Sequence, residues 1–386
     1  MAATLTNTRA PSRLAWLDAL RGLGALAVVG EHLFTAAVPW LRPTWINLGT
    51  YGVLVFFLVS GYIIPVSLER HGDLRAFWIG RIFRLYPLYL AVIGVVLALS
   101  WWMPLRAEVA REASSVAAHL TMLMDVVGAG GVLNTMWTLS YEMVFYLLVT
   151  ALFVTGVRAG RGLLAIGFGV AALAAGVTLS RAPLSGSWAA WVSLAVFAVG
   201  LACVISGRGR RVAAIALGVL ALALLLLTSR VPWFGAAMLA VMFAGTAIRR
   251  WEQGTGPLWP VFVAGALVLV TPVWAISAGW WWVQPDVWGA TVLLAGGTFA
   301  AGMALRGRRV PYALSWLGVI SYSLYLVHLP ILLAVLRVSG EMRWAPVPAQ
   351  VGLAVGVLVL VLGGSWLTYR FVERPGQRLG KSVLDP

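Results

Sequence analysis

The sequence predicts an all-α integral membrane protein, a polytopic bundle of about twelve transmembrane helices with both termini in the cytoplasm. Of its 386 residues, 61% are hydrophobic and only 11% are charged, whereas a soluble domain carries about 25% charged residues. Apolar runs of about 20 residues, enough to cross a hydrocarbon core of about 30 Å, recur along the whole chain. These runs lack the period-2 alternation of barrel strands, so helices are the structure that pairs their backbone groups in lipid.

Twelve apolar segments are the expected helices. A count of ten or eleven stays open, because the segments around Pro232 and around 271–290 are weakly delimited. The expected helices are 15–38, 46–67, 86–105, 136–156, 162–180, 187–206, 212–228, 232–248, 259–277, 287–305, 314–336 and 346–369.

The basic side chains set the expected orientation. If the N-terminus is inside, 21 of the 28 lysines and arginines fall on the cytoplasmic side and 7 on the other. The positive-inside rule therefore places both termini in the cytoplasm and favours an even number of helices. We expect one transmembrane domain over 1–386, with cytoplasmic tails at 1–13 and 374–386.

Several other interpretations of the composition are set aside. The net charge of +15 does not indicate nucleic-acid binding, because the arginines lie between the apolar runs and form no soluble basic patch. Cys203 is the sole cysteine, which excludes an intrachain disulfide. A cleaved signal peptide is disfavoured, because Glu31 and His32 lie before the stretch at 35–37 that resembles a processing site. The segment 106–135 is expected to be an external loop, and Trp280, Trp281 and Trp282 are expected to be interfacial anchors.

Ionisable residues inside the apolar segments are the candidates for chemistry, because charge in lipid is costly. Asp18 and Arg21 lie three residues apart on one face near the cytoplasmic end of the first segment, where a purely structural ion pair is an equal alternative. His32 lies eleven residues after Arg21, about 17 Å further along a helix. Glu142 and His328 are expected at a similar depth on other helices. An imidazole beside a carboxylate makes a general base, although each histidine can also simply bond a neighbouring helix.

Arginines before the third apolar segment form a second candidate site. Arg81 and Arg84 lie three residues apart on one face, and guanidinium groups suit phosphates. Contact with lipid headgroups is the alternative for these two residues and the preferred interpretation for Arg75.

These residues fall within motifs that resemble the membrane acyltransferase-3 family of bacterial O-acyltransferases. Six motif matches occur in order over residues 17–375, and Thr138 stands where the family pattern has serine. The matching residues are Leu17, Asp18, Leu20, Arg21, Gly22 and His32; Phe56, Phe57, Ser60, Gly61 and Tyr62; Arg81, Arg84, Tyr86 and Pro87; Trp137, Leu139, Glu142, Phe145 and Tyr146; Ser321, Tyr322, Tyr325, His328 and Pro330; and Glu373 with Pro375.

The resemblance implies transfer of an acyl group, expected to be acetyl, from acyl-CoA to a hydroxyl of a glycan, glycolipid or secondary metabolite at a bacterial cell (inner or plasma) membrane. It implies no permanently bound cofactor and no metal. Direct transfer is the simpler route, since no serine or cysteine nucleophile is well placed, but transient acylation of the histidine stays open. The implied roles are general base for His32, its support for Glu142, supporting positions for Asp18, Arg21, His328 and Tyr325, and donor binding for Arg81, Arg84, Ser60 and Tyr62.

Two other functions remain as alternatives. A proton-coupled transporter would use the same buried histidines and carboxylates, but the sequence has no inverted repeat. A non-catalytic scaffold would leave the layer of polar groups unexplained. The acceptor, the acyl chain length, the side of acylation and the oligomeric state are not encoded in any pattern that we recognise.

Overall fold

The computed structural model describes residues 15–103, 112–157, 161–340 and 344–384, and over these it is entirely helical, with no strand. Ten of the described helices are long and apolar enough to cross a membrane. The all-α membrane class is therefore confirmed, while the count of twelve and the cytoplasmic termini stay predictions. The expected tail 1–13 lies outside the described residues.

The helices follow the expected apolar segments in order. The α-helices are α1 Ala15–Ala37, α2 Leu48–His71, α3 Leu74–Leu99, α4 Ala113–Leu120, α5 Trp137–Thr155, α6 Arg161–Thr178, α7 Trp188–Ser206, α8 Arg210–Leu227, α9 Pro232–Glu252, α10 Trp259–Val270, α11 Val273–Ser277, α12 Pro285–Ala304, α13 Tyr312–Val319, α14 Ser321–Ser339, α15 Val347–Thr368 and α16 Arg374–Leu384. Single 3₁₀ turns are η1 Pro39–Leu41, η2 Asn134–Met136 and η3 Trp281–Val283, and a π-helical turn, η5, covers Tyr369–Glu373.

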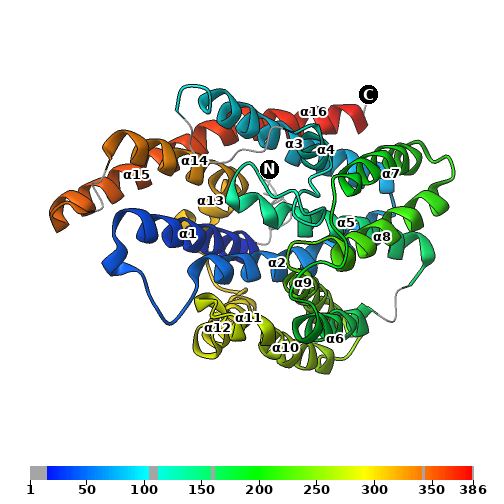
Figure 1. Cartoon of the computed structure of the whole chain (residues 1–386). Helices are drawn as coiled ribbons and strands as arrows, with labels where there is room; N and C mark the ends of the chain where they lie inside the picture. Colours follow the sequence, from blue (N-terminus) through cyan, green and yellow to red (C-terminus); the bar gives the residue numbers. More distant parts are fainter. Residues whose placement is uncertain (1–14, 104–111, 158–160, 341–343, 385–386) are drawn as a thin grey trace, which may run out of the picture.

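The bundle surrounds α1 and α2, which cross the middle of the molecule (Figure 1). The helices α3 and α16 run together along the top of that view, and α6, α10 and α12 lie at the bottom. α2 also packs against α9, the most buried of the spanning helices. At this crossing Gly61 of α2 meets the α9 backbone, and a Cβ there would lie 1.7 Å from the Met242 carbonyl oxygen. Only glycine allows the two backbones to approach so closely.

The third membrane helix begins twelve residues before the expected residue 86. Gly72, at φ 70°, ends α2, and Asp73 caps α3 by accepting hydrogen bonds from the Arg75 and Ala76 amides at 2.8 and 3.2 Å. Glycine followed by aspartate is a strong stop-and-start signal. As a result, Arg81 and Arg84 lie on the third membrane helix itself and not before it.

Three expected helices are interrupted or extended. The segment 259–277 breaks at Thr271–Pro272 into α10 and α11, and 314–336 breaks at Ile320 into α13 and α14. The last segment continues from α15 through η5 into α16, a run of 38 residues. At 1.5 Å per residue this run is about 57 Å long, so α16 must project beyond a hydrocarbon core of about 30 Å. The expected tail 374–386 is therefore helical over its described part.

The segment expected to be an external loop, 106–135, instead packs into the bundle over its described part. After the short helix α4, residues 121–127 are buried in an irregular conformation that reaches η2 and then α5. Met122 (φ 57°), Gly128 (φ 78°) and Gly130 (φ 69°) adopt left-handed conformations along it. Hydropathy could not predict this course, because the segment is too short and too broken to resemble a spanning helix.

Candidate active site

A large cavity of about 1160 Å³ lies among α1, α2, the start of α5 and the segment after α4. His32 and Glu31 reach it from α1, and Asn47 and Thr50 from the start of α2. The opposite side is aromatic and includes Trp137, Phe234, Trp280 and Trp282. We call this space the large cavity.

His32 contacts His328 across the boundary between α1 and α14. The His32 Nδ1 atom lies 3.4 Å from the His328 Nε2 atom, and the ring centroids are 5.1 Å apart. The two residues are 296 positions apart in the sequence. The expected convergence of these two histidines is therefore formed.

Local hydrogen bonds fix which nitrogen of each neutral ring carries the proton. Nδ1 of His32 lies 2.9 Å from the Val28 carbonyl oxygen, and Nδ1 of His328 lies 3.0 Å from the Leu324 carbonyl oxygen. A carbonyl only accepts, so each Nδ1 must donate. His328 Nε2 then accepts from the His32 Nδ1–H. The Nε2 lone pair of His32 has no hydrogen-bond partner among the described residues and is available to accept a proton.

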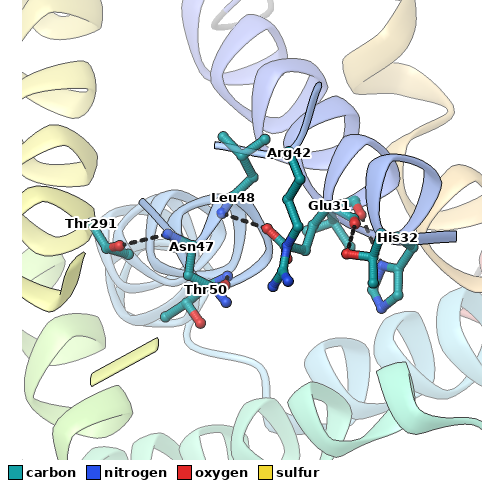
Figure 2. A network of polar contacts seen from close by, with 9 residues as sticks. Glu31, His32, Arg42, Asn47, Leu48, Thr50 and Thr291 are labelled. Atoms are coloured by element: carbon teal, nitrogen blue, oxygen red, sulfur yellow. Dashed lines mark hydrogen bonds and ion pairs between the residues drawn. The ribbon is translucent and has the colours of Figure 1, made fainter. Parts of the chain in front are cut away.

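Glu31 turns away from His32 and organises the rim of the large cavity. Its carboxylate accepts hydrogen bonds from the Arg42 guanidinium at 2.8 and 3.0 Å and from the Leu48 amide at 3.0 Å. Figure 2 shows the carboxylate directed toward Arg42 and Leu48, with the His32 ring on another side of α1. The Asn47 amide donates to Thr291, and its side chain caps α2 at the Thr50 amide (Figure 2). This network ties the start of α2 to α1 beside the histidine.

Glu142 is not the hydrogen-bond partner of His32 that the sequence suggested. Its carboxylate accepts a short hydrogen bond from the Tyr146 hydroxyl, one turn further along α5. It lines a separate cavity of about 70 Å³, the arginine cavity, together with Arg21, Arg81 and Arg84. His328 takes the place next to His32 that was expected for the carboxylate. The error arose because a similar depth in the membrane does not fix the direction in which a side chain points.

Tyr325 and Val53 separate the two cavities, because both residues line both spaces. The Tyr325 hydroxyl donates to the Thr135 carbonyl oxygen at 2.9 Å and accepts from the Thr138 hydroxyl at 2.9 Å. Threonine supplies the same donor as the serine of the family pattern, so this substitution keeps the contact. The tyrosine ring therefore forms a hydrogen-bonded wall between the histidine and the arginines.

A third cavity, of about 300 Å³, continues from the arginine cavity toward the C-terminal helix. Arg21 and Arg84 line both spaces, while Asp18 and Glu373 line the third cavity alone. We call it the terminal cavity, since Gln377 of α16 also faces it. Three adjacent spaces thus lead from the end of the chain to His32, and two shared walls divide them.

Ser60 and Tyr62, the two other residues expected to bind the acyl donor, do not lie together. Ser60 lines the arginine cavity. Tyr62 instead contacts α9, where its hydroxyl donates to Glu252 and accepts from Arg249 at 3.0 Å. The structure does not bring Tyr62 to the expected arginines.

Sequence reasoning missed Asp125, a further titratable residue of the large cavity. Burial raises the pKa of the Asp125 carboxyl, opposed by a hydrogen bond from the Tyr141 hydroxyl at 2.7 Å and by the charge of Arg230. Its isolated place in an apparent loop gave no signal in the sequence.

His119 of α4 holds the same segment from outside the cavity. Its Nδ1–H donates to the Ser115 carbonyl oxygen at 2.7 Å, and its Nε2 accepts from the Val132 amide at 3.0 Å. Burial lowers the pKa of His119, which matches this neutral, accepting form.

The tryptophans expected at the interface are divided between two positions. Trp280 and Trp282 line the large cavity, with ring centroids 5.8 Å apart. Trp281 is more exposed and lies under the Arg42 guanidinium at 4.1 Å. Trp280 and Trp282 therefore face a cavity, and the role of the three tryptophans as interfacial anchors stays a prediction. No cluster of three or more metal-ligating side chains occurs in the part of the chain that the structure describes.

Comparison with known families decides the class of the protein. The family model described as "Acyltransferase domain" matches residues 14–370, which include the large cavity, the arginine cavity and the terminal cavity except for Glu373 and Gln377. The chain belongs to this acyltransferase family. The resemblance inferred from the six motifs is thereby confirmed.

Curated relatives of this chain are transacylases or O-acetyltransferases by their names, and one of them is named as membrane-bound. "Putative membrane-bound transacylase BcsY" of Komagataeibacter xylinus is 28% identical over 380 residues, covering 93% of this chain and 82% of that protein. "Peptidoglycan O-acetyltransferase OatA" of Listeria monocytogenes is 30% identical over 179 residues, 41% of this chain and 28% of that protein. "Putative peptidoglycan O-acetyltransferase YrhL" of Bacillus subtilis is 29% identical over 160 residues, 36% of this chain and 24% of that protein. The chain thus matches only about a quarter of the two peptidoglycan enzymes. No solved structure matches it.

Proposed function

We propose that this acyltransferase moves an acyl group, expected to be acetyl, from acyl-CoA to a hydroxyl of a glycan, glycolipid or secondary metabolite, with His32 as general base. The observation that carries the proposal is the free Nε2 of His32 in a large polar and aromatic cavity, one wall away from a cavity lined by three arginines. The names of the relatives support O-acylation and a glycan acceptor.

The proposed reaction uses the two sides of the Tyr325 wall. The acceptor hydroxyl enters the large cavity and donates its proton to His32 Nε2 while its oxygen attacks the thioester carbonyl. The carbon–sulfur bond breaks, the thiolate leaves, and His32 returns the proton to the sulfur. General-base catalysis of this kind contributes about 10²–10⁴-fold to rate.

His328 acts as the positioning residue in this scheme. Its Nε2 accepts from the Nδ1–H of His32 and so keeps the basic nitrogen on the side of the large cavity. It replaces the carboxylate that orients the base in many hydrolases. Glu142 would instead hold Tyr146 and balance the charge of the three arginines.

Purified protein in lipid vesicles, supplied with radiolabelled acetyl-CoA and a panel of glycan acceptors, tests the proposal. We expect acetylated product from wild type, a loss of about 10²–10⁴-fold for His32→Ala, and the same thermal unfolding for both proteins. His32→Gln is the matched control, because it keeps a hydrogen-bonding side chain but lacks a basic nitrogen.

Two outcomes would count against the proposal. Full activity of His32→Ala would remove this residue from the chemistry. Absence of acetylated product for every acceptor, together with acetyl-CoA-independent movement of protons and solute across the vesicle, would favour a proton-coupled transporter. A transporter leaves no acylated product.

A further inference from the structure

The arginine cavity is too small to hold the nucleotide part of a CoA thioester, and the charges that line it and the terminal cavity balance one another. Its volume of about 70 Å³ is far below the roughly 300–1,000 Å³ of pockets that enclose a drug-sized ligand. The described lining of this space and the terminal cavity contains three arginines and three carboxylates. A group with a pyrophosphate and a further phosphate would gain no net positive charge there, and desolvating it would be costly. The slender thioester arm suits this passage better than the nucleotide does.

The helix α16 lies against α3, the helix that carries Arg81 and Arg84 (Figure 1). Two glycines one turn apart make this close contact. A Cβ at Gly376 would lie 2.8 Å from the Phe83 carbonyl oxygen, and one at Gly380 would lie 2.7 Å from the Phe83 Cβ. The position of α16 relative to the arginine cavity is therefore fixed by backbone packing.

Glu373 sets the rotation of α16 about its axis. This carboxylate is buried and accepts hydrogen bonds from the Ser323 hydroxyl at 2.8 Å and from the Gln377 amide at 3.0 Å. It also interacts electrostatically with Arg84. The π-helical turn that ends at Glu373 shifts the helical register by one residue, and such turns are frequent at functional sites. Gln377 is thereby turned into the terminal cavity.

The face of α16 beside Gln377 is basic and exposed. Arg374, Gln377, Arg378 and Lys381 follow the i, i+3, i+4, i+7 spacing of a single helical face. The three cationic side chains are exposed, and no ion pair links them to a carboxylate within the described residues. We call Arg374, Arg378 and Lys381 the basic face. It continues the rim of the terminal cavity outward, beyond the length of helix that a bilayer covers.

We propose that the basic face binds the nucleotide phosphates of the acyl donor at the mouth of the terminal cavity. The inference rests on the proposed function, since it assigns the donor's polyanionic end to α16 and its thioester arm to the cavities. From Arg21 to His32 the arm must travel about 17 Å along α1, through the arginine cavity and past Tyr325. The phosphates thereby stay in water, where cationic side chains bind them without the cost of burial.

The test compares a donor with phosphates and one without. The triple variant R374Q/R378Q/K381Q and wild type are placed in vesicles of neutral phosphatidylcholine and assayed with acetyl-CoA and with S-acetyl-pantetheine. We expect KM for acetyl-CoA to rise at least about tenfold with kcat within twofold, and KM for S-acetyl-pantetheine to be unchanged. The matched control R208Q/R211Q/R309Q removes three exposed charges elsewhere and should keep both KM values.

Other results would overturn the inference. An equal change for both donors would mean that the basic face supports the fold and not the phosphates. A defect that appears only when phosphatidylglycerol is added to the vesicles, and equally for both donors, would assign the face to lipid headgroup phosphates. Failure of the proposed function is distinct from these, because wild type would then form no product from either donor.

Discussion

Replacement of His328 by phenylalanine isolates the contact that orients His32. The side chain is 1% exposed, so a ring of similar size is the substitution that the packing tolerates best. The change removes the acceptor 3.4 Å from His32 Nδ1, but the hydrogen bond of the same nitrogen to the Val28 carbonyl oxygen at 2.9 Å remains. One neutral hydrogen bond contributes about 0.5–1.5 kcal/mol. At about 1.36 kcal/mol per factor of ten, kcat should fall between about twofold and about twelvefold.

The assay is steady-state acetyl transfer by reconstituted protein, with KM measured for both substrates and thermal unfolding as the check on folding. KM for each substrate should stay within twofold of the wild-type value, because His328 is not among the residues that line the large cavity or the arginine cavity. An unchanged kcat would refute orientation of His32 by His328. A loss as large as that expected for His32→Ala, about 10²–10⁴-fold, would show that His328 itself handles the proton.

Three further predictions concern the wall, the buried segment and a helix crossing. Tyr325→Ala should open the wall between the large cavity and the arginine cavity and increase acceptor-independent hydrolysis of acetyl-CoA at least about tenfold. Tyr325→Phe keeps the ring and should leave this hydrolysis unchanged. If Tyr325→Ala hydrolyses acetyl-CoA no faster than wild type, Tyr325 does not separate the two cavities. Because burial lowers the pKa of His119, only the unfolded state takes up a proton near pH 6.5, so thermal stability should fall as pH drops through about 6.5. His119→Gln should make that slope shallower, because one proton fewer is taken up on unfolding. Gly61→Ala should destabilise the protein by about 1–3 kcal/mol in detergent melts, unlike Gly80→Ala, whose Cβ would meet nothing within 4 Å.

Hydropathy and helix signals were enough to predict the positions of the membrane helices. Continuous apolar runs placed α5, α7 and α8 within two residues at each end. The start of α3 was also encoded, because Gly72 and Asp73 are a stop and a cap, but the expected helix covered only the apolar run from residue 86. Long arginine side chains reach polar surroundings from within a helix, so their presence does not end one. The breaks at Thr271–Pro272 and Ile320 depend on packing between helices, which cannot be predicted from the sequence of one segment alone.

The sequence predicted which residues belong to the candidate site, but not which of them contact one another. The cost of charge in lipid singled out His32, Glu142 and His328 from the sequence. Which of them meet depends on the rotation and tilt of three helices, and these are set by packing against neighbours. A helix rotated by one residue, about 100°, would exchange one partner for another. This is why His328 lies beside His32 while Glu142 lies with the arginines.

The separation of the large cavity from the arginine cavity depends on where the irregular segment after α4 ends. Thr135 of η2 accepts the hydrogen bond that fixes Tyr325, and Thr138 in the first turn of α5 donates the second. The wall between the histidine and the arginines is therefore held by the segment that hydropathy assigned to an external loop. Moving the ring aside breaks two neutral hydrogen bonds, a cost of about 1–3 kcal/mol, which the arrival of a thioester arm can offset by burying its own apolar atoms. A donor-dependent opening of Tyr325 would keep water from the thioester until the acyl group reaches the side where His32 and the acceptor meet.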